Sequence, residues 1–289
     1  MIADIGSWFM QVVGGGVTQT LWLLVCIALP FGLLAWLLHW LERQIQLPLV
    51  RRFGWGSILW TGWLGTPVHE LSHAAMCIVF RHRINEMALF RPDKNNGRLG
   101  YVKHSFNREN YYQVIGNFFI GLAPLVGGTI LLFLLLWLFY PAAAQQAFVA
   151  NGMSEAIAGG KIFEALSTFG KLTFGVLSHA VTGANVLSLR FWLFLYLVLC
   201  VGSHMAPSLD DYRGAMWGAW LVLVMLFLTS VAFLAFGGEG GVVARIAPLF
   251  GPALAMFSLC AVLCGLSAIV VLLFTSAWDL VFGEPRPVT

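Results

Sequence analysis

The sequence predicts an all-α polytopic membrane protein with about six transmembrane helices and a small membrane-associated β-hairpin after the second of them. Of the 289 residues, 59% are hydrophobic and only 10% are charged. Soluble domains carry about 25% charged residues, so lipid must be the solvent for most of this surface. The formal net charge of +3 is too small to indicate a nucleic-acid partner. We therefore expect residues 1–289 to form a single integral membrane domain in a lipid bilayer.

Six apolar stretches account for the predicted helices. A transmembrane helix needs about 20 residues to cross about 30 Å of hydrocarbon. Five stretches reach or approach that length: Thr18 to Trp40, Val114 to Tyr140, Leu187 to Ala206, Gly214 to Phe236 and Pro248 to Leu280. The first has no basic region before it, so we expect a retained span and not a cleaved signal peptide. The sixth stretch, Phe53 to Phe80, is also apolar but contains three ionisable side chains.

A polar, basic segment between residues 81 and 113 predicts a β-hairpin. Ile84–Phe90 and Arg98–His104 have the composition of short strands, and Asn96-Gly97 between them has turn chemistry. Cytoplasmic loops of membrane proteins carry an excess of Lys and Arg. We therefore expect the hairpin and both termini to face the cytoplasm, in the inner membrane of a bacterial cell.

Two further features concern the connections and the helix interiors. Residues Ile162–Leu177 predict an amphipathic helix on the membrane surface or over a site. Membrane helices tolerate proline where neighbouring groups satisfy the carbonyls that it frees. The prolines inside the apolar stretches are Pro30, Pro67, Pro124 and Pro252.

The sixth stretch contains His69-Glu70-Leu71-Ser72-His73, an H-E-x-x-H motif. On a helix, residues four apart lie on one face, so both imidazoles can reach one metal ion. Glu70 lies beside them and can take a proton from an attacking water molecule. Each ionisable group costs roughly 2.5–3.5 kcal/mol if it is left unpaired at the centre of a membrane helix, and metal ligation would satisfy it. The motif predicts one Zn²⁺ per chain, and the alternative is a buried hydrogen-bonded cluster without metal.

A third ligand is required, because catalytic zinc sites use three protein ligands and an open position. The strongest candidate is Asp210, in the segment His204-Met-Ala-Pro-Ser-Leu-Asp-Asp211. This segment follows an apolar stretch, and Pro207 breaks the helix there. His204 is the main rival as third ligand, and Asp211 could orient a ligand or replace Asp210. The alternative is a solvated loop between two spans.

These residues resemble the site-2 protease family of intramembrane zinc metalloproteases. That family has H-E-x-x-H on one transmembrane helix, a β-hairpin after it, and a later proline-containing break followed by Leu-Asp-Gly. Here Pro207-Ser-Leu209-Asp210 matches the break and the Leu-Asp pair. The resemblance implies that the two motif histidines and Asp210 hold zinc and that Glu70 is the catalytic base. It implies an endopeptidase that cleaves membrane-protein or peptide substrates within or near a transmembrane segment, with a core at about residues 53–236.

The sequence departs from the family pattern in three places. Asp211 stands where the family usually has glycine, and His204 stands where it often has asparagine. The family's middle helix often carries Gly-Pro followed by an asparagine, whereas this chain has Gly116-Asn117 and then Pro124. Asn117 would correspond to the family asparagine that contacts the substrate backbone. Such departures indicate a divergent member.

Two other functions compete with this interpretation. A membrane metalloprotease of a different kind would take glutamate as the third ligand, and Glu109, Glu155 and Glu164 are available. A metal-binding transporter or non-catalytic membrane protein is the second alternative. Transporters often repeat their broken helices in two halves, but the H-E-x-x-H segment has no second copy here. The sequence does not indicate an oligomeric state.

The remaining cysteines and histidines receive simpler interpretations. The five cysteines lie inside apolar stretches without metal-ligand spacing, so we interpret them as small packing residues. His82 and His104 are interpreted as solvated or hairpin residues. The cysteines are Cys26, Cys77, Cys200, Cys260 and Cys264.

Overall fold

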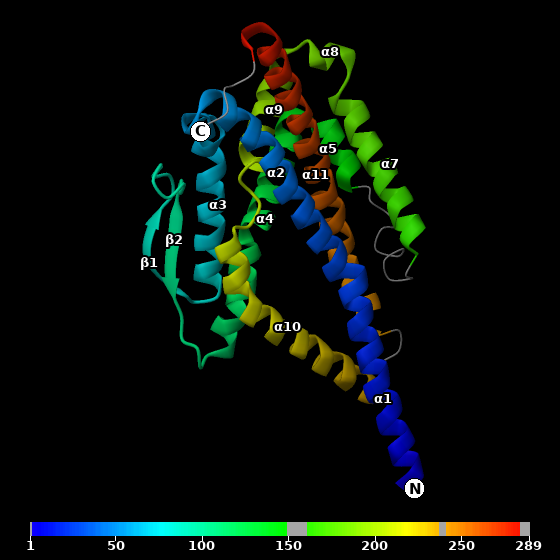
Figure 1. Cartoon of the computed structure of the whole chain (residues 1–289). Helices are drawn as coiled ribbons and strands as arrows, with labels where there is room; N and C mark the ends of the chain where they lie inside the picture. Colours follow the sequence, from blue (N-terminus) through cyan, green and yellow to red (C-terminus); the bar gives the residue numbers. More distant parts are fainter. Residues whose placement is uncertain (1, 149–160, 237–240, 284–289) are drawn as a thin grey trace.

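The computed structural model describes residues 2–148, 161–236 and 241–283. It consists of long helices and one two-stranded sheet (Figure 1). The helices before the sheet are α1 Ile2–Leu23, α2 Leu29–Phe53 and α3 Leu59–Val79, with a π-helical turn at Leu24–Ala28 and a 3-10 turn at Trp55–Ile58. The sheet pairs β1 Arg83–Ala88 with β2 Tyr101–Ser105. After it come α4 Tyr111–Phe139, α5 Pro141–Phe148, α7 Ile162–Ala180, α8 Gly183–Val186, α9 Leu189–Gly202, α10 Leu209–Ala235 and α11 Gly241–Phe282.

Three of the described helices are long and apolar enough to cross a membrane: α4, α10 and residues Ala253–Phe282 of α11. Helix α10 gives the most direct indication that the protein lies in lipid, because only 11% of its apolar stretch is buried inside the protein. Trp217, Trp220 and Leu228 are among its exposed side chains. A continuous apolar surface of this kind is stable against lipid and not against water. The prediction of a mostly helical protein with helices of membrane-spanning length is confirmed.

The predicted number of about six spans is not supported by the described residues. The predicted span Leu187 to Ala206 corresponds to α9, which has only 14 residues. A helix of that length extends about 21 Å, which is less than the hydrocarbon thickness of about 30 Å. The predicted span Phe53 to Phe80 corresponds to α3, in which the H-E-x-x-H motif lowers the mean hydropathy. The predicted span Thr18 to Trp40 covers the end of α1, the π-helical turn Leu24–Ala28 and the start of α2, so neither α-helix contains the whole of it.

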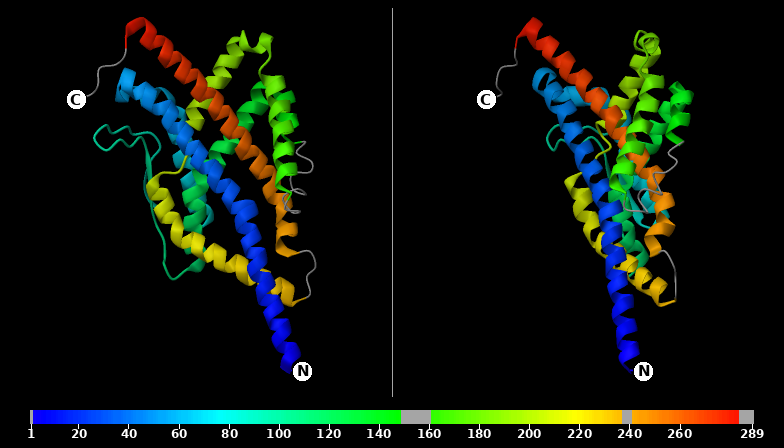
Figure 2. Two further views of the ribbon diagram at one scale, coloured as in Figure 1. Left: turned by 45° about the vertical axis from the view of Figure 1, so that its right-hand side comes forward. Right: turned by 90° about the vertical axis from the view of Figure 1, so that its right-hand side faces the viewer.

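The core lies where α2, α4, α9 and α11 meet. Helices α2 and α11 pack along each other, as both views of Figure 2 show. The core includes Leu38 of α2, Leu132 and Leu136 of α4, and Val198 of α9, all with no exposed surface. Because lipid tails are as apolar as these side chains, close van der Waals packing holds such a core together more than the exclusion of water does.

The predicted β-hairpin is confirmed, and it lies beside α3 (Figure 1). The two strands are antiparallel, with Ile84 opposite His104 and a bulge between Ile84 and Glu86. The tip of the hairpin contains Gly97 at a φ of 69°, a left-handed conformation that glycine adopts without a steric penalty. The turn that the sequence predicts at Asn96-Gly97 is therefore present.

An exposed polar group stabilises the two strands of the hairpin. The Glu86 carboxylate accepts hydrogen bonds from the Lys103 ammonium and the Tyr101 hydroxyl. The Lys103 hydrogen bond is the main cause that holds the pKa of Glu86 below its ordinary value, and the same bond raises the pKa of Lys103. The carboxylate is thus charged in the folded hairpin at neutral pH.

The helix predicted at Ile162–Leu177 is present as α7, which packs against α5. Helix α1 begins at one end of the molecule and α11 ends at the other (Figure 1). This arrangement assigns neither end to a side of a membrane. The cytoplasmic position of both termini and of the hairpin therefore stays a prediction.

Candidate metal centre

The H-E-x-x-H motif lies on α3, and its two histidines face the same side of the helix. The imidazole centroids of His69 and His73 are 4.8 Å apart, and their Nε2 atoms are 3.1 Å apart. Two nitrogens that each lie about 2.0–2.1 Å from a tetrahedral zinc ion are separated by about 3.3 Å. The two side chains thus have the spacing that one zinc ion requires.

Backbone carbonyls orient both imidazoles. His69 Nδ1 lies 2.7 Å from the carbonyl oxygen of His204, and His73 Nδ1 lies 2.8 Å from that of Ile120. A carbonyl oxygen only accepts, so each Nδ1 donates there, and in a neutral ring Nε2 is then the nitrogen with the free lone pair. Two such lone pairs face each other at 3.1 Å and repel, unless a cation or a proton lies between them. Metal-ligating histidines typically have this kind of Nδ1 partner.

Both carbonyls are available because the helices near them are interrupted. In α4, the carbonyl of Ile120 would normally accept from the backbone N–H of residue 124, but Pro124 has no N–H. His204 follows the end of α9, where backbone carbonyls lack helical partners. Two irregularities in separate helices therefore orient the two histidines of α3.

The end of α9 reaches α3 at Gly65. A Cβ atom at this position would lie only 2.1 Å from the carbonyl oxygen of Cys200 and 2.8 Å from the Cβ of His204. Small residues permit such close backbone approach between membrane helices. Gly65 thus lets the His204 carbonyl come within hydrogen-bonding distance of His69.

Asp211 brings a carboxylate to the same place. Its Oδ1 lies 3.3 Å from His73 Nε2, and its Oδ2 lies 3.7 Å from His69 Nε2. The same carboxylate accepts a 2.7 Å hydrogen bond from the backbone N–H of Ser208, whose hydroxyl accepts in return from the Asp211 N–H. This reciprocal pair is a capping box at the start of α10. It holds the carboxylate against the two imidazoles, and the three side chains form a group that could bind a metal ion.

The structure places Asp210, the residue predicted as third ligand, outside this group. Its side chain is 73% exposed, and its carboxylate lies 3.6 Å from Arg213 and 3.7 Å from Arg98. Successive residues of an α-helix point about 100° apart, so Asp210 turns away when Asp211 faces α3. The structure therefore brings Asp211, which the sequence offered as one alternative to Asp210, to the two histidines.

Glu70 is buried and lies next to the ligand group. Its carboxylate interacts electrostatically with His69 and with Asp211. The hairpin backbone covers it closely, since a Cβ atom on Gly100 would lie 2.9 Å from Glu70 Cγ. The hairpin thus shields this side chain from lipid while leaving it beside the histidines.

Two other predicted residues lie near the site without entering the ligand group. His204 contributes its carbonyl, while its ring Nδ1 lies 3.0 Å from Ser203 Oγ and its buried Nε2 has no hydrogen-bond partner. Asn117 is buried on α4, one turn before Ile120, and its Nδ2 lies 3.4 Å from the Val114 carbonyl oxygen. His204 thus contacts His69 through its carbonyl, and its ring lies outside the group of His69, His73 and Asp211.

The glutamates that the sequence offers as alternative third ligands do not lie with His69 and His73 in the described residues. Glu109 is exposed in the segment before α4, and Glu164 is exposed on α7, where it pairs with Lys161 at 3.1 Å. In Figure 1, α7 and the hairpin lie on opposite sides of α3 and α4. Glu155 lies outside the described residues.

Comparison with family models, characterised proteins and solved structures found no match. The resemblance to the site-2 protease family therefore rests on the short motifs and the hairpin that follows the first of them. What that resemblance implies for activity is a proposal.

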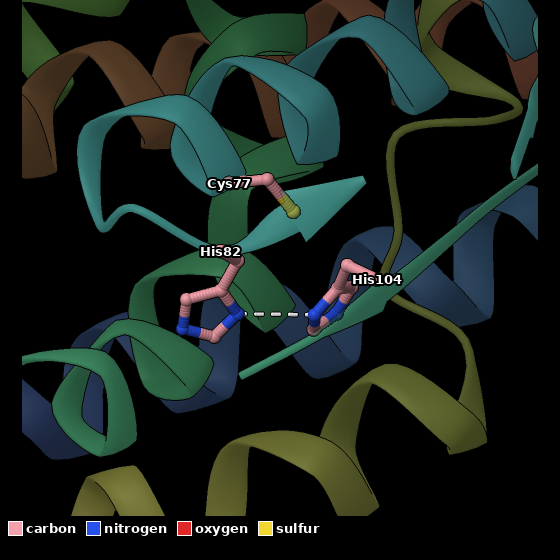
Figure 3. A group of neighbouring side chains, drawn as sticks. All are labelled: Cys77, His82 and His104. Carbon is pink, nitrogen blue, oxygen red and sulfur yellow. Dashed lines mark hydrogen bonds between the residues drawn. The ribbon is translucent and has the colours of Figure 1, made fainter. Parts of the chain in front are cut away.

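A second group of potential ligands was not anticipated from the sequence. Cys77, His82 and His104 lie together at the end of α3 (Figure 3). His82, which the sequence suggests is a solvated or hairpin residue, is only 6% exposed and is therefore not solvated. Burial is the main cause that lowers the pKa of both imidazoles, and the neighbouring His82 ring adds to the effect on His104, whose pKa falls to about 4. Both imidazoles are therefore neutral at physiological pH, which is the form that binds metals.

Proposed function

We propose that this chain is a zinc-dependent intramembrane endopeptidase, a divergent relative of the site-2 proteases. The observation that carries the proposal is the group of His69, His73 and Asp211, in which each Nδ1 is engaged by a backbone carbonyl and each Nε2 is the nitrogen that faces the group. Two imidazole nitrogens and one carboxylate oxygen match the ligand set of catalytic zinc sites. A bound zinc ion would acidify the attacking water and polarise the scissile carbonyl.

Glu70 would move the proton in this reaction. It lies beside the ligand group, and its carboxylate would accept a proton from the attacking water. It would then give that proton to the nitrogen of the leaving amine when the peptide C–N bond breaks. The cover of the hairpin over Glu70 would limit competing exchange with bulk water.

The substrate would be a membrane-protein segment that unwinds near the site. An intact helix hides its amides in internal hydrogen bonds, so the scissile bond must first leave that arrangement. In the described residues the sheet has two strands, and each strand therefore keeps one edge without a neighbouring strand. An extended segment could pair with such an edge by strand addition. The alternative role of the hairpin is to cover the site only.

The rival metalloprotease interpretation loses support from the placement of the glutamates. Glu109 and Glu164 are exposed, whereas Asp211 already lies 3.3 Å from His73. A non-catalytic metal-binding membrane protein would share the same ligand group. Cleavage, and not metal content, separates that function from a protease.

The test uses the purified full chain and three matched preparations: wild type, Glu70→Gln and Glu109→Gln. Each is reconstituted with inner-membrane proteins from a bacterial host, and new N-termini are labelled and identified by mass spectrometry. We expect cuts within or beside transmembrane segments for wild type and for Glu109→Gln. Glu70→Gln should retain its zinc and lose those cuts.

Each other outcome is informative. Full cleavage by Glu70→Gln would overturn the role of Glu70 as proton carrier. Zinc in the wild type without any cleavage would favour the non-catalytic metal-binding protein. Loss of zinc in Glu109→Gln would restore the rival with glutamate as a ligand.

A further inference from the structure

The end of α3 brings a thiol and two imidazoles together, one helical turn beyond His73. Cys77 lies in the last turn of α3, His82 follows that helix, and His104 comes from β2 (Figure 3). One ligand atom from each side chain lies within 4.8 Å of the other two. Cys77 has no exposed surface, and His82 is 6% exposed. The cluster therefore joins three separate parts of the chain at a buried point.

The local fold explains why Cys77 and His82 meet. The backbone N–H of His82 donates to the carbonyl of Cys77 at 2.8 Å, and that of Arg81 donates to Ile78 at 3.1 Å. These two bonds define a Schellman motif, in which the first and last residues lie side by side. The turn needs a left-handed residue, and Arg81 occupies it with a φ of 58°. A residue with a side chain in this conformation costs roughly 1–2 kcal/mol, so the turn is held by its surroundings.

The ring of His82 is fixed with one nitrogen available. Its Nε2 lies 2.7 Å from the Gln113 carbonyl oxygen and must carry the proton. Phe106 stacks on the ring at 5.1 Å with an angle of 16° between the planes. The unprotonated Nδ1 therefore points in one direction, toward His104 Nδ1 at 3.0 Å. This separation is close to the value of about 3.3 Å for two nitrogens on a tetrahedral zinc ion.

We propose that Cys77, His82 and His104 bind a second zinc ion, distinct from the ion of the H-E-x-x-H group. A thiolate and two neutral imidazoles are ligands that suit zinc, with the fourth position left for water. Binding requires the Cys77 thiol to release its proton to solvent, so affinity rises with pH. The His82 bond to Gln113 is the outer contact that keeps its free nitrogen aimed at the ion.

The site would fasten the hairpin to the end of α3. His104 lies on β2, only four residues after Gly100, which covers Glu70. His73 and Cys77 are four residues apart and lie on the same face of α3. An ion held by Cys77 and His104 would therefore hold the covering strand in register over the H-E-x-x-H motif. This inference needs only the Cys77 group, so it does not depend on peptidase activity.

Cobalt provides a specific test, because a cobalt ion bound by a thiolate shows a near-ultraviolet charge-transfer band. Among the described residues, the group of His69, His73 and Asp211 contains no sulfur. The band therefore reports the Cys77 group alone. The purified full chain is stripped with a chelator, loaded with cobalt in detergent, and analysed for its spectrum and for metal content.

We expect the wild type to show the band and to bind a second equivalent of metal. Cys77→Ala should lose the band and that equivalent, and His104→Ala, on the more exposed hairpin, should do the same. His73→Ala should keep the band while losing the other equivalent, which separates this inference from the proposed function. Cys200→Ala, which alters a buried free cysteine on α9, is the matched control and should keep both.

Two results would overturn the inference. One is a wild type without the band. The other is an unchanged band in Cys77→Ala, whatever Cys200→Ala shows. In either case the two histidines would form a hydrogen-bonded pair without metal.

Discussion

The neighbouring aspartates at the start of α10 allow a sharp test of the metal centre. Asp211 lies 3.3 Å from His73 Nε2, whereas Asp210 is 73% exposed and contacts only arginines among the pairs described. Zinc sites with four protein ligands bind with about 10–16 kcal/mol, so one ligand contributes about 2.5–4 kcal/mol. At about 1.4 kcal/mol per tenfold change, Asp211→Asn should weaken zinc binding by about two to three powers of ten. Asp210→Asn removes surface ion pairs worth about 0–1 kcal/mol and should leave zinc affinity nearly unchanged.

A third variant separates the ligand role of Asp211 from its capping role. Ser208→Ala removes the hydroxyl that accepts from the Asp211 N–H, but it keeps the backbone N–H that holds the carboxylate. It should therefore lower stability by about 1 kcal/mol while retaining zinc. The assay is competition with a chromophoric zinc chelator, run beside thermal unfolding in the same detergent. Equal zinc loss in Asp210→Asn and Asp211→Asn, or no loss in Asp211→Asn, would refute the assignment.

Further expected outcomes follow from single contacts. Gly65→Val should lower the melting temperature in detergent and weaken zinc binding, because the valine Cβ would lie 2.1 Å from the Cys200 carbonyl oxygen. Gly32→Val is the control: a Cβ atom there has nothing within 4 Å, so neither the melting temperature nor zinc binding should change. His204→Ala should keep its zinc, because His69 is held by the His204 carbonyl and not by its ring; loss of zinc in a folded variant would show that the ring is a ligand. Glu86→Gln should speed amide hydrogen exchange in the hairpin, where unchanged exchange would show that the carboxylate contributes nothing. Because the folded pKa of Glu86 lies below its unfolded value, this contribution is present above that unfolded value and is lost as pH falls through the folded pKa.

The coarse fold was accessible from the sequence because it depends on local patterns. Apolar length predicted α4, α10 and the long apolar part of α11, and the Asn96-Gly97 turn predicted the hairpin. The number of spans was not accessible in the same way. Whether an apolar stretch crosses a membrane depends on where its helix begins and ends. Helix α9 ends at Gly202, before the proline at residue 207 that marked the end of the predicted stretch.

Helix geometry explains why the structure brings Asp211, and not the predicted Asp210, to the two histidines. The Leu-Asp pair of the resembling family points to Asp210, and the sequence alone contains no rotation angle for α10. A local signal did exist, since Ser208 and Asp211 have the spacing of a capping box. That box sets the start of α10 and therefore the direction of Asp211. The Cys77 group had no such signal, because its Schellman motif uses Arg81 where glycine is usual.

The two histidines of the motif also depend on residues far from it in sequence. Pro124 frees the carbonyl that orients His73, and the end of α9 frees the carbonyl that orients His69. A proline inside a membrane helix leaves an unsatisfied acceptor that neighbouring groups must satisfy. Here the acceptor is satisfied by an imidazole N–H, and that bond orients the ring so that Nε2 faces His69. The interruption of α4 is thus tied to the chemistry of α3, because a continuous α4 would give the Ile120 carbonyl a competing donor.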